Sequence, residues 1–117
     1  MHTKKEYAKL AKDFKECQKV LVALGDENRL HILYQMMVIE RPRGVRVGEI
    51  VKMSNLSRPA VSHHMKILKK AGIVRVRPEG TMNFYYLDPD MKSFKDLISV
   101  LQRSTEYAAE LPYRVEE

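Results

Sequence analysis

Residues 56–74 read LSRPAVSHHMKILKKAGIV, and this stretch decides the fold. Ser57 is a good helix N-cap, and Pro59 suits the first turn because the first amides of a helix have no partner within it. Gly72 is typical of the position just after a helix end. The stretch therefore predicts a helix that runs from Ser57 to about Ala71.

The two faces of this helix differ in chemistry. With about 100° between successive residues, Val61, Met65 and Leu68 lie on one face. The opposite face carries small, polar and basic side chains, namely Pro59, Ser62, His63, Lys66 and Lys70. No acid occurs between residues 57 and 72. We therefore expect the apolar face to pack on the domain and the basic face to meet an anionic partner.

Short elements flank this helix on both sides. Residues 48–54 read as a short helix, and residues 54–56 form a turn, so residues 48–71 make a helix-turn-helix. Residues 73–77 alternate like a strand, residues 78–81 (PEGT) favour a turn, and residues 83–87 form a return strand. Arg75 and Arg77 lie on the same side of this hairpin. A basic wing over residues 73–87 is therefore expected beside the basic helix.

Longer amphipathic helices are expected towards both ends of the chain. Apolar residues at three- and four-residue spacing predict one continuous helix over residues 7–24 and a last helix from Pro89 to about residue 108. Asp26 caps a second helix that runs to about Glu40, and residues 112–117 form a frayed tail. The fold class is therefore mainly α with a small β-hairpin, in the order α-α-α-α-β-β-α of a winged helix-turn-helix.

Charge is concentrated in the middle of the chain. One domain accounts for all 117 residues, and ten basic residues stand against two acids between residues 41 and 80. This segment therefore carries a charge of +8, which accounts for all the excess behind the net charge of +6 of the whole chain. No apolar run is long enough to cross a membrane, and a single cysteine excludes an internal disulfide. We therefore expect a cytoplasmic protein without a membrane partner.

The charge, the motif order and the hairpin coincide, and together they predict binding to double-stranded DNA. In a helix-turn-helix the second helix enters the major groove, while a wing can lay arginines along phosphates. Arg58 can pair with guanine, and histidines can donate to bases or phosphates. The predicted DNA-binding residues are Ser57, Arg58, Pro59, Ser62, His63, His64, Lys66, Lys70, Arg75 and Arg77.

The chain resembles the ArsR/SmtB-type repressors over about residues 20–87. Residues 24–33 (LGDENRLHIL) are similar to the opening signature of that family, and residues 56–74 are similar to its recognition helix. Glu79-Gly80 and residues 85–87 (YYL) resemble its wing tip and return strand. The resemblance implies a homodimer formed by the first and last helices (residues 1–24 and 90–111). It also implies repression of a palindromic operator that an inducer relieves.

The metal-binding motifs of that family are absent. Many relatives bind metals through a Cys-Val-Cys motif at the start of the short helix, where this chain has Arg46, Val47 and Gly48. Others bind zinc through Asp, His and Glu on the last helix, but this chain has no histidine after His64. Adjacent residues such as His63 and His64 point about 100° apart on a helix. We therefore predict neither a metal site nor a cofactor.

The predicted dimer interface lies on the first and last helices, at Tyr7, Leu10, Phe14, Cys17, Leu21, Phe94, Ile98 and Leu101. A buried core would produce the same spacing, so the pattern leaves both interpretations open. Cys17 also has two interpretations. A buried thiol acts as a small hydrophobe, whereas two thiols near a twofold axis could form a disulfide or bind a soft metal.

Several other functions compete with the predicted one. An enzyme lacks support, because the sequence has no nucleophile elbow, phosphate-binding glycine loop or suitably paired acids. RNA binding is disfavoured because the exposed helix has no aromatic residues on which bases could stack. The alternatives that stay open are a thiol- or metal-responsive repressor that switches through Cys17 and a winged helix that binds an acidic protein.

Overall fold

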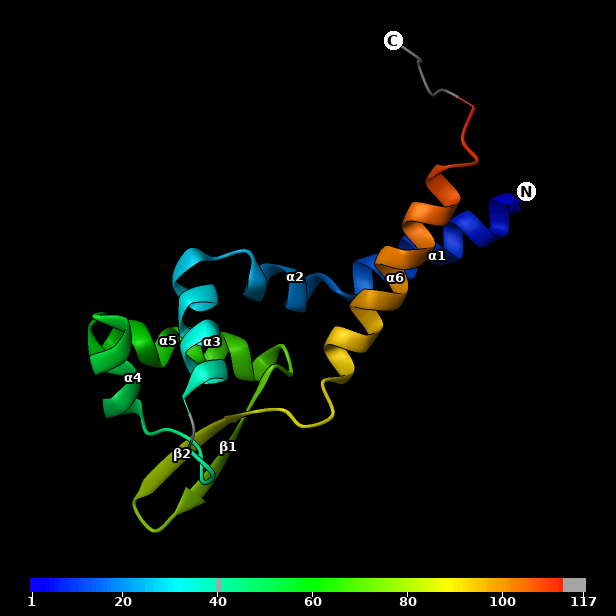
Figure 1. Cartoon of the computed structure of the whole chain (residues 1–117). Coiled ribbons are helices and arrows are strands. Elements are labelled where there is room, and N and C mark those ends of the chain that lie inside the picture. The colour runs from blue at the N-terminus through cyan, green and yellow to red at the C-terminus, as the bar shows by residue number, and fades with distance from the viewer. Residues whose placement is uncertain (40, 113–117) are drawn as a thin grey trace.

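The computed structural model describes residues 1–39 and 41–112. In this part of the chain the elements are α1 (Lys4–Glu16), α2 (Gln18–Leu24), α3 (Glu27–Val38), α4 (Val47–Ser54), α5 (Arg58–Lys70), β1 (Val74–Glu79), β2 (Met82–Leu87) and α6 (Lys92–Ala108) (Figure 1). Helices α4 and α5 form the helix-turn-helix, and β1 and β2 form the wing. The predicted helix end at Glu40 and residues 113–117 of the predicted tail lie outside the described residues.

Helix α5 has the caps that its sequence predicts. The side chain of Ser57 accepts a hydrogen bond from the backbone N–H of Ala60 at 3.3 Å. At the other end Gly72 has a φ of 76°, in the left-handed region that favours glycine. The backbone N–H of Ile73 then donates to the carbonyl of Leu68 at 3.0 Å, as in a Schellman motif. This turn leads the chain from α5 directly into β1.

The wing is tied to the loop before α4. Strands β1 and β2 pair antiparallel along their full lengths, and Val45 adds an isolated bridge to Tyr85 through hydrogen bonds of 2.8 and 2.7 Å. The hairpin is longer than predicted, because Pro78 lies within β1 and not in the turn. An edge strand tolerates proline, since it need not donate every N–H to a neighbour.

The core lies between α3, α4, α5 and the base of the wing. Its most deeply buried side chains come from all of these elements: Ile32, Leu33, Val45, Ile50, Val61, Met65, Leu68, Ile73 and Val74. Three of them, Val61, Met65 and Leu68, are the predicted apolar face of α5. Burying a side chain of this size contributes roughly 1.5–3 kcal/mol. The opposite face of α5 is therefore presented by a firmly packed helix.

The first predicted helix is not continuous. It divides at Cys17, which has φ −85° and ψ 6°. The backbone N–H of Cys17 donates to the carbonyl of Phe14 at 3.0 Å, as in a tight 3₁₀ turn. The bend lets α2 pack against α3 and α5 while α1 packs against α6. The apolar spacing over residues 7–24 gave no sign of this break, because apolar residues recur at helical intervals on both sides of Cys17.

Helices α1 and α6 lie side by side and project away from the helix-turn-helix (Figure 1). The radius of gyration is 18.2 Å, and the longest extent is 56 Å. A compact domain of about 100 residues has a radius of gyration of about 13 Å. The chain is therefore elongated: the α1–α6 pair extends away from the helix-turn-helix, although Leu97 and Val100 of α6 belong to the same buried apolar cluster.

Candidate nucleic-acid interface

Helix α5 presents a polar and basic surface to solvent. Six of its predicted DNA-binding side chains are exposed and form what we call the α5 face: Arg58, Pro59, Ser62, His63, Lys66 and Lys70. The helix contains no acid. Within the described part of the chain, no ion pair engages its cations. The structure therefore brings six of the ten predicted residues together on one accessible surface.

Two other predicted DNA-binding residues have contacts within the chain. The side-chain oxygen of Ser57 already accepts the cap hydrogen bond of α5. His64 is half-buried, and its Nδ1 lies 3.3 Å from Nη1 of Arg29. Because a guanidinium only donates, this Nδ1 is the acceptor and carries no proton. Burial also lowers the pKa of His64, which favours the neutral ring.

Arg29 is a buried cation whose role the sequence analysis missed. Only 7% exposed, it donates from Nε to the carbonyl of Ala23 at 2.8 Å and from Nη2 to the carbonyl of Val22 at 2.9 Å. Both carbonyls belong to the last turn of α2, where backbone acceptors lose their usual partners, and that of Val22 also accepts from the N–H of Gly25 at 3.2 Å. Together with its contact to His64, Arg29 joins the end of α2, the start of α3 and the inner side of α5. In the sequence Arg29 follows the N-cap acid Asp26 by three residues. Such a spacing of opposite charges is common on the exposed surface of helices, so the sequence gave no sign that Arg29 is buried.

The two predicted wing arginines are held by contacts within the chain. The Nε of Arg75 lies 3.1 Å from a carboxylate oxygen of Asp88. The Nε of Arg77 lies 3.5 Å from Glu79, and its guanidinium also donates to the carbonyl of Arg43. A role of Arg75 and Arg77 in DNA binding stays a prediction.

The residues predicted for the dimer interface divide into two groups. Five are buried or half-buried within the chain itself: Tyr7, Leu10, Cys17, Leu21 and Phe94. Three are exposed and form what we call the α1–α6 face: Phe14, Ile98 and Leu101. Ile98 is 62% exposed and Leu101 is 44% exposed. The apolar residues of the first and last helices thus belong partly to the core of the chain and partly to an exposed surface.

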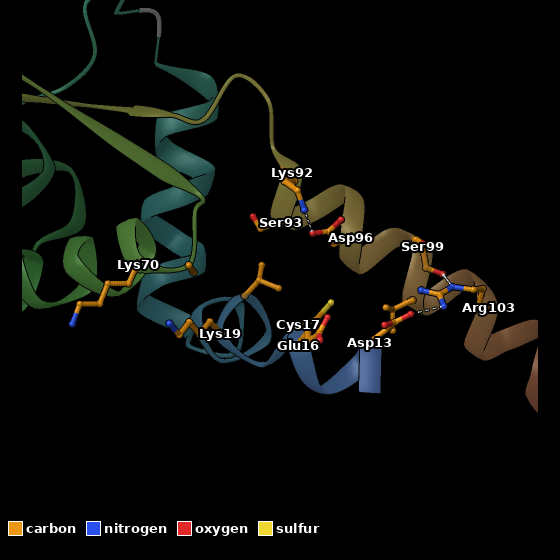
Figure 2. A pocket seen from close by; sticks show the side chains of 13 residues that line it. Asp13, Glu16, Cys17, Lys19, Lys70, Lys92, Ser93, Asp96, Ser99 and Arg103 are labelled. Atoms are coloured by element: carbon orange, nitrogen blue, oxygen red, sulfur yellow. Dashed lines mark hydrogen bonds and ion pairs between the residues drawn. The ribbon is translucent and has the colours of Figure 1, made fainter. Parts of the chain in front are cut away.

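Cys17 faces a groove between α1, α2 and α6 (Figure 2). The groove has a volume of about 440 Å³ and is lined by the ion pairs Asp13–Arg103 at 2.9 Å and Lys92–Asp96 at 2.8 Å. Cys17 is only 5% exposed, and burial raises the pKa of its thiol. A protonated thiol is a weak nucleophile and a poor metal ligand. This environment favours the structural interpretation of Cys17.

Neither a metal site nor a membrane-spanning helix is found among the described residues. No group of three or more His, Cys, Asp or Glu side chains in this part of the chain is placed to hold a metal ion. The rings of His63 and His64 have centroids 5.9 Å apart and are tilted by 54° to each other. In the same part of the chain, none of the helices has the length and apolar character needed to span a bilayer.

Comparisons with known proteins identify the family. The sequence model of a protein family described as "Bacterial regulatory protein, arsR family" matches residues 26–76. An uncharacterized HTH-type transcriptional regulator from Methanocaldococcus jannaschii is 41% identical over 77 residues, which make up 66% of this chain and 83% of that relative. The chain belongs to the ArsR family. It is therefore a transcriptional regulator with a DNA-binding winged helix-turn-helix, and the resemblance found in the sequence is confirmed.

Two further similar proteins extend the comparison to the whole fold. The transcriptional activator HlyU from Vibrio cholerae is 33% identical over 84 residues, 72% of each chain. The structure of reduced HlyU has a TM-score of 0.60 and covers 82% of this chain and 95% of that one, at 30% identity. A homodimeric winged helix-turn-helix DNA-binding domain from Mycobacterium bovis has a TM-score of 0.58, covers 98% and 97% of the two chains, and is 23% identical. The predicted winged helix-turn-helix fold is confirmed.

Proposed function

We propose that this ArsR-family regulator is a repressor that binds a palindromic operator as a homodimer. The α5 face carries the proposal, because it is exposed, free of acids and backed by fully buried apolar side chains. Such a helix can enter the major groove with its first residues next to base edges. Ser62 and His63 are then placed to read bases, and Lys66 and Lys70 to contact phosphates.

A second copy of the chain is the partner that best fits the α1–α6 face. Phe14, Ile98 and Leu101 lie exposed on two helices that project from the main core. Burying side chains of this kind against a symmetry-related copy contributes roughly 1.5–3 kcal/mol for each that is fully covered. The similar domain from Mycobacterium bovis is a homodimer, which supports the same arrangement here. Two α5 helices would then read two half-sites about one helical turn, or a multiple of one, apart.

Repression requires only that the dimer occupies promoter DNA and excludes the transcription machinery. The α5 face would provide that occupancy, and the chain would act in the cytoplasm, together with the DNA that it binds. The related HlyU is an activator, so the sign of regulation depends on where the operator lies relative to the promoter.

Footprinting of the purified protein on the DNA that flanks its gene tests the proposal. We expect a symmetric protected region and reduced transcription from the same DNA in vitro. With about six or more phosphate contacts, affinity should fall about a thousandfold between about 50 and 200 mM salt. Absence of duplex binding at the low end of this range would reject the proposal. Binding to an acidic protein under those conditions would then indicate an interaction module.

A further inference from the structure

A second basic surface lies between α4, the start of α5 and the tip of the wing. It is a groove of about 480 Å³, which we call the α4–wing groove. Its polar lining comes from segments far apart in the sequence, namely Arg46, Glu49, Lys52, Arg58, Thr81 and Asn83. All of these side chains are exposed except that of Glu49, which is half-buried. Of the three cations, only Arg58 is among the DNA-binding residues that the sequence predicted.

None of the three cations of this groove pairs with an acid in the part of the chain that the structure describes. No ion pair within the described residues engages Arg46, Lys52 or Arg58. The one acid that lines the groove, Glu49, is instead paired with Arg41 at 3.2 Å and accepts a hydrogen bond from the backbone N–H of Arg46 at 3.3 Å. The three cations of the groove therefore outnumber its single acid, whose carboxylate is already engaged. Such a surface attracts phosphate.

The wing arginines differ from these cations. Arg75 is paired with Asp88 at 3.1 Å. Arg77 lies 3.5 Å from Glu79 without a hydrogen bond from its Nε, and it is held mainly by its hydrogen bond to the carbonyl of Arg43, while Arg43 is the closer partner of Glu79 at 3.1 Å. An arginine that must leave a carboxylate before it can bind a phosphate exchanges one ion pair for another, and the net gain is small. An unpaired cation exchanges only water and counterions, and the release of counterions from DNA favours binding.

We propose that the α4–wing groove holds backbone phosphates of the duplex whose major groove α5 enters. Arg46 and Lys52, rather than Arg75 and Arg77, then carry the salt-dependent contacts beside the wing. This inference rests on the proposed DNA binding. Arg58, the first residue of α5, belongs to both the α5 face and the groove. The phosphate contacts of the groove are therefore directly next to the base contacts of α5. They set the register of α5 on the bases without reading sequence themselves.

Salt titration of duplex binding tests the groove. Affinities of the wild type, Arg46→Gln, Lys52→Gln and the double variant are measured on operator and random duplexes between about 50 and 200 mM salt. We expect each single change to reduce the slope of log affinity against log salt by about 0.9, and the double change by about twice that. The loss should be equal on both duplexes. Lys12→Gln, which removes an exposed charge on α1, is the matched control.

The outcomes separate this inference from the proposed function. Failure of the wild type to bind any duplex at the lowest salt concentration would reject both. A wild type that binds with a steep salt slope, together with an unchanged slope in the folded double variant, would reject the groove alone. A slope change in Arg75→Gln as large as that of the double variant would also reject it. Circular dichroism of each variant confirms folding, since both groove substitutions lie at exposed positions.

Discussion

The helix-turn-helix body and the α1–α6 pair differ in how they treat their apolar side chains. In the body, the faces that α3, α4 and α5 turn inward are covered within one chain, and Met65 and Leu68 are fully buried. In the α1–α6 pair, Leu97 and Val100 are buried, but Ile98 and Leu101 between and beside them are exposed. The body exposes apolar side chains of α3 as well, at Tyr34, Met37 and Val38, but its core is closed from three or more sides, whereas the pair packs two helices together and leaves a surface that a second copy can cover.

The same contrast explains the shape of the chain. A radius of gyration of 18.2 Å is large for its length because the α1–α6 pair stands away from the body. If the two regions differ as described, a substitution in the body should change stability, and one on the α1–α6 face should change assembly.

The largest expected effect follows from a cavity in the body. Leu68→Ala should lower the free energy of unfolding by about 3 kcal/mol, because the surrounding core cannot fully collapse onto the missing atoms. Urea denaturation measures this change. The control Val38→Ala alters a side chain that is 80% exposed on α3. This control should change stability by less than about 0.5 kcal/mol. Equal losses from both substitutions would contradict the described core.

A charge on the α1–α6 face should separate the two copies. Ile98→Glu combined with Leu101→Glu should weaken the dimer about a hundredfold, because two carboxylates would have to lose water at the interface. Sedimentation velocity measures the dissociation, and operator affinity should fall with it. Val38→Glu is the control, since it places a carboxylate at an exposed apolar position of the body. A double variant that stays dimeric would show that the copies meet elsewhere.

Base reading by the α5 face should give an effect of intermediate size. His63→Ala should weaken operator binding by about 1–3 kcal/mol and binding to random DNA much less, because a base contact carries sequence information. Lys66→Ala should weaken both about equally if it contacts phosphate. Competition assays on the two duplexes compare them. Equal losses from His63→Ala on both DNAs would place this residue at a phosphate.

The smallest expected effect is a pH dependence inside the body. Burial lowers the pKa of His64 below its ordinary value of 6.5, so the unfolded chain takes up this proton more readily than the folded one. The stability that His64 contributes should therefore be present above pH 6.5 and decline as the pH falls below it. Thermal melts between pH 7.5 and 5.5 should show a weaker decline in His64→Gln. An unchanged decline would assign the titration to another group.

Local signals in the sequence predicted much of this fold. The Ser57 cap, the Gly72 stop and the apolar spacing of α5 depend on neighbouring residues alone, and the structure has them where they were expected. The break at Cys17 was not predictable in this way, since it arises because α1 and α2 pack against different elements. The wing extended through Pro78 for a similar reason, because pairing with β2 outweighs a turn preference.

The sequence by itself determined the order of the elements, the apolar and basic faces of α5 and the concentration of charge between residues 41 and 80. Those features are periodic or additive along the chain. Only the tertiary structure decided which cations are paired, because Arg75 meets Asp88 across the wing and Arg77 meets Glu79 on its own strand, while Arg46 and Lys52, among the described residues, meet no acid. It also decided that His64 turns inward to Arg29. Pairing and burial depend on distances between elements, and those distances are set by packing.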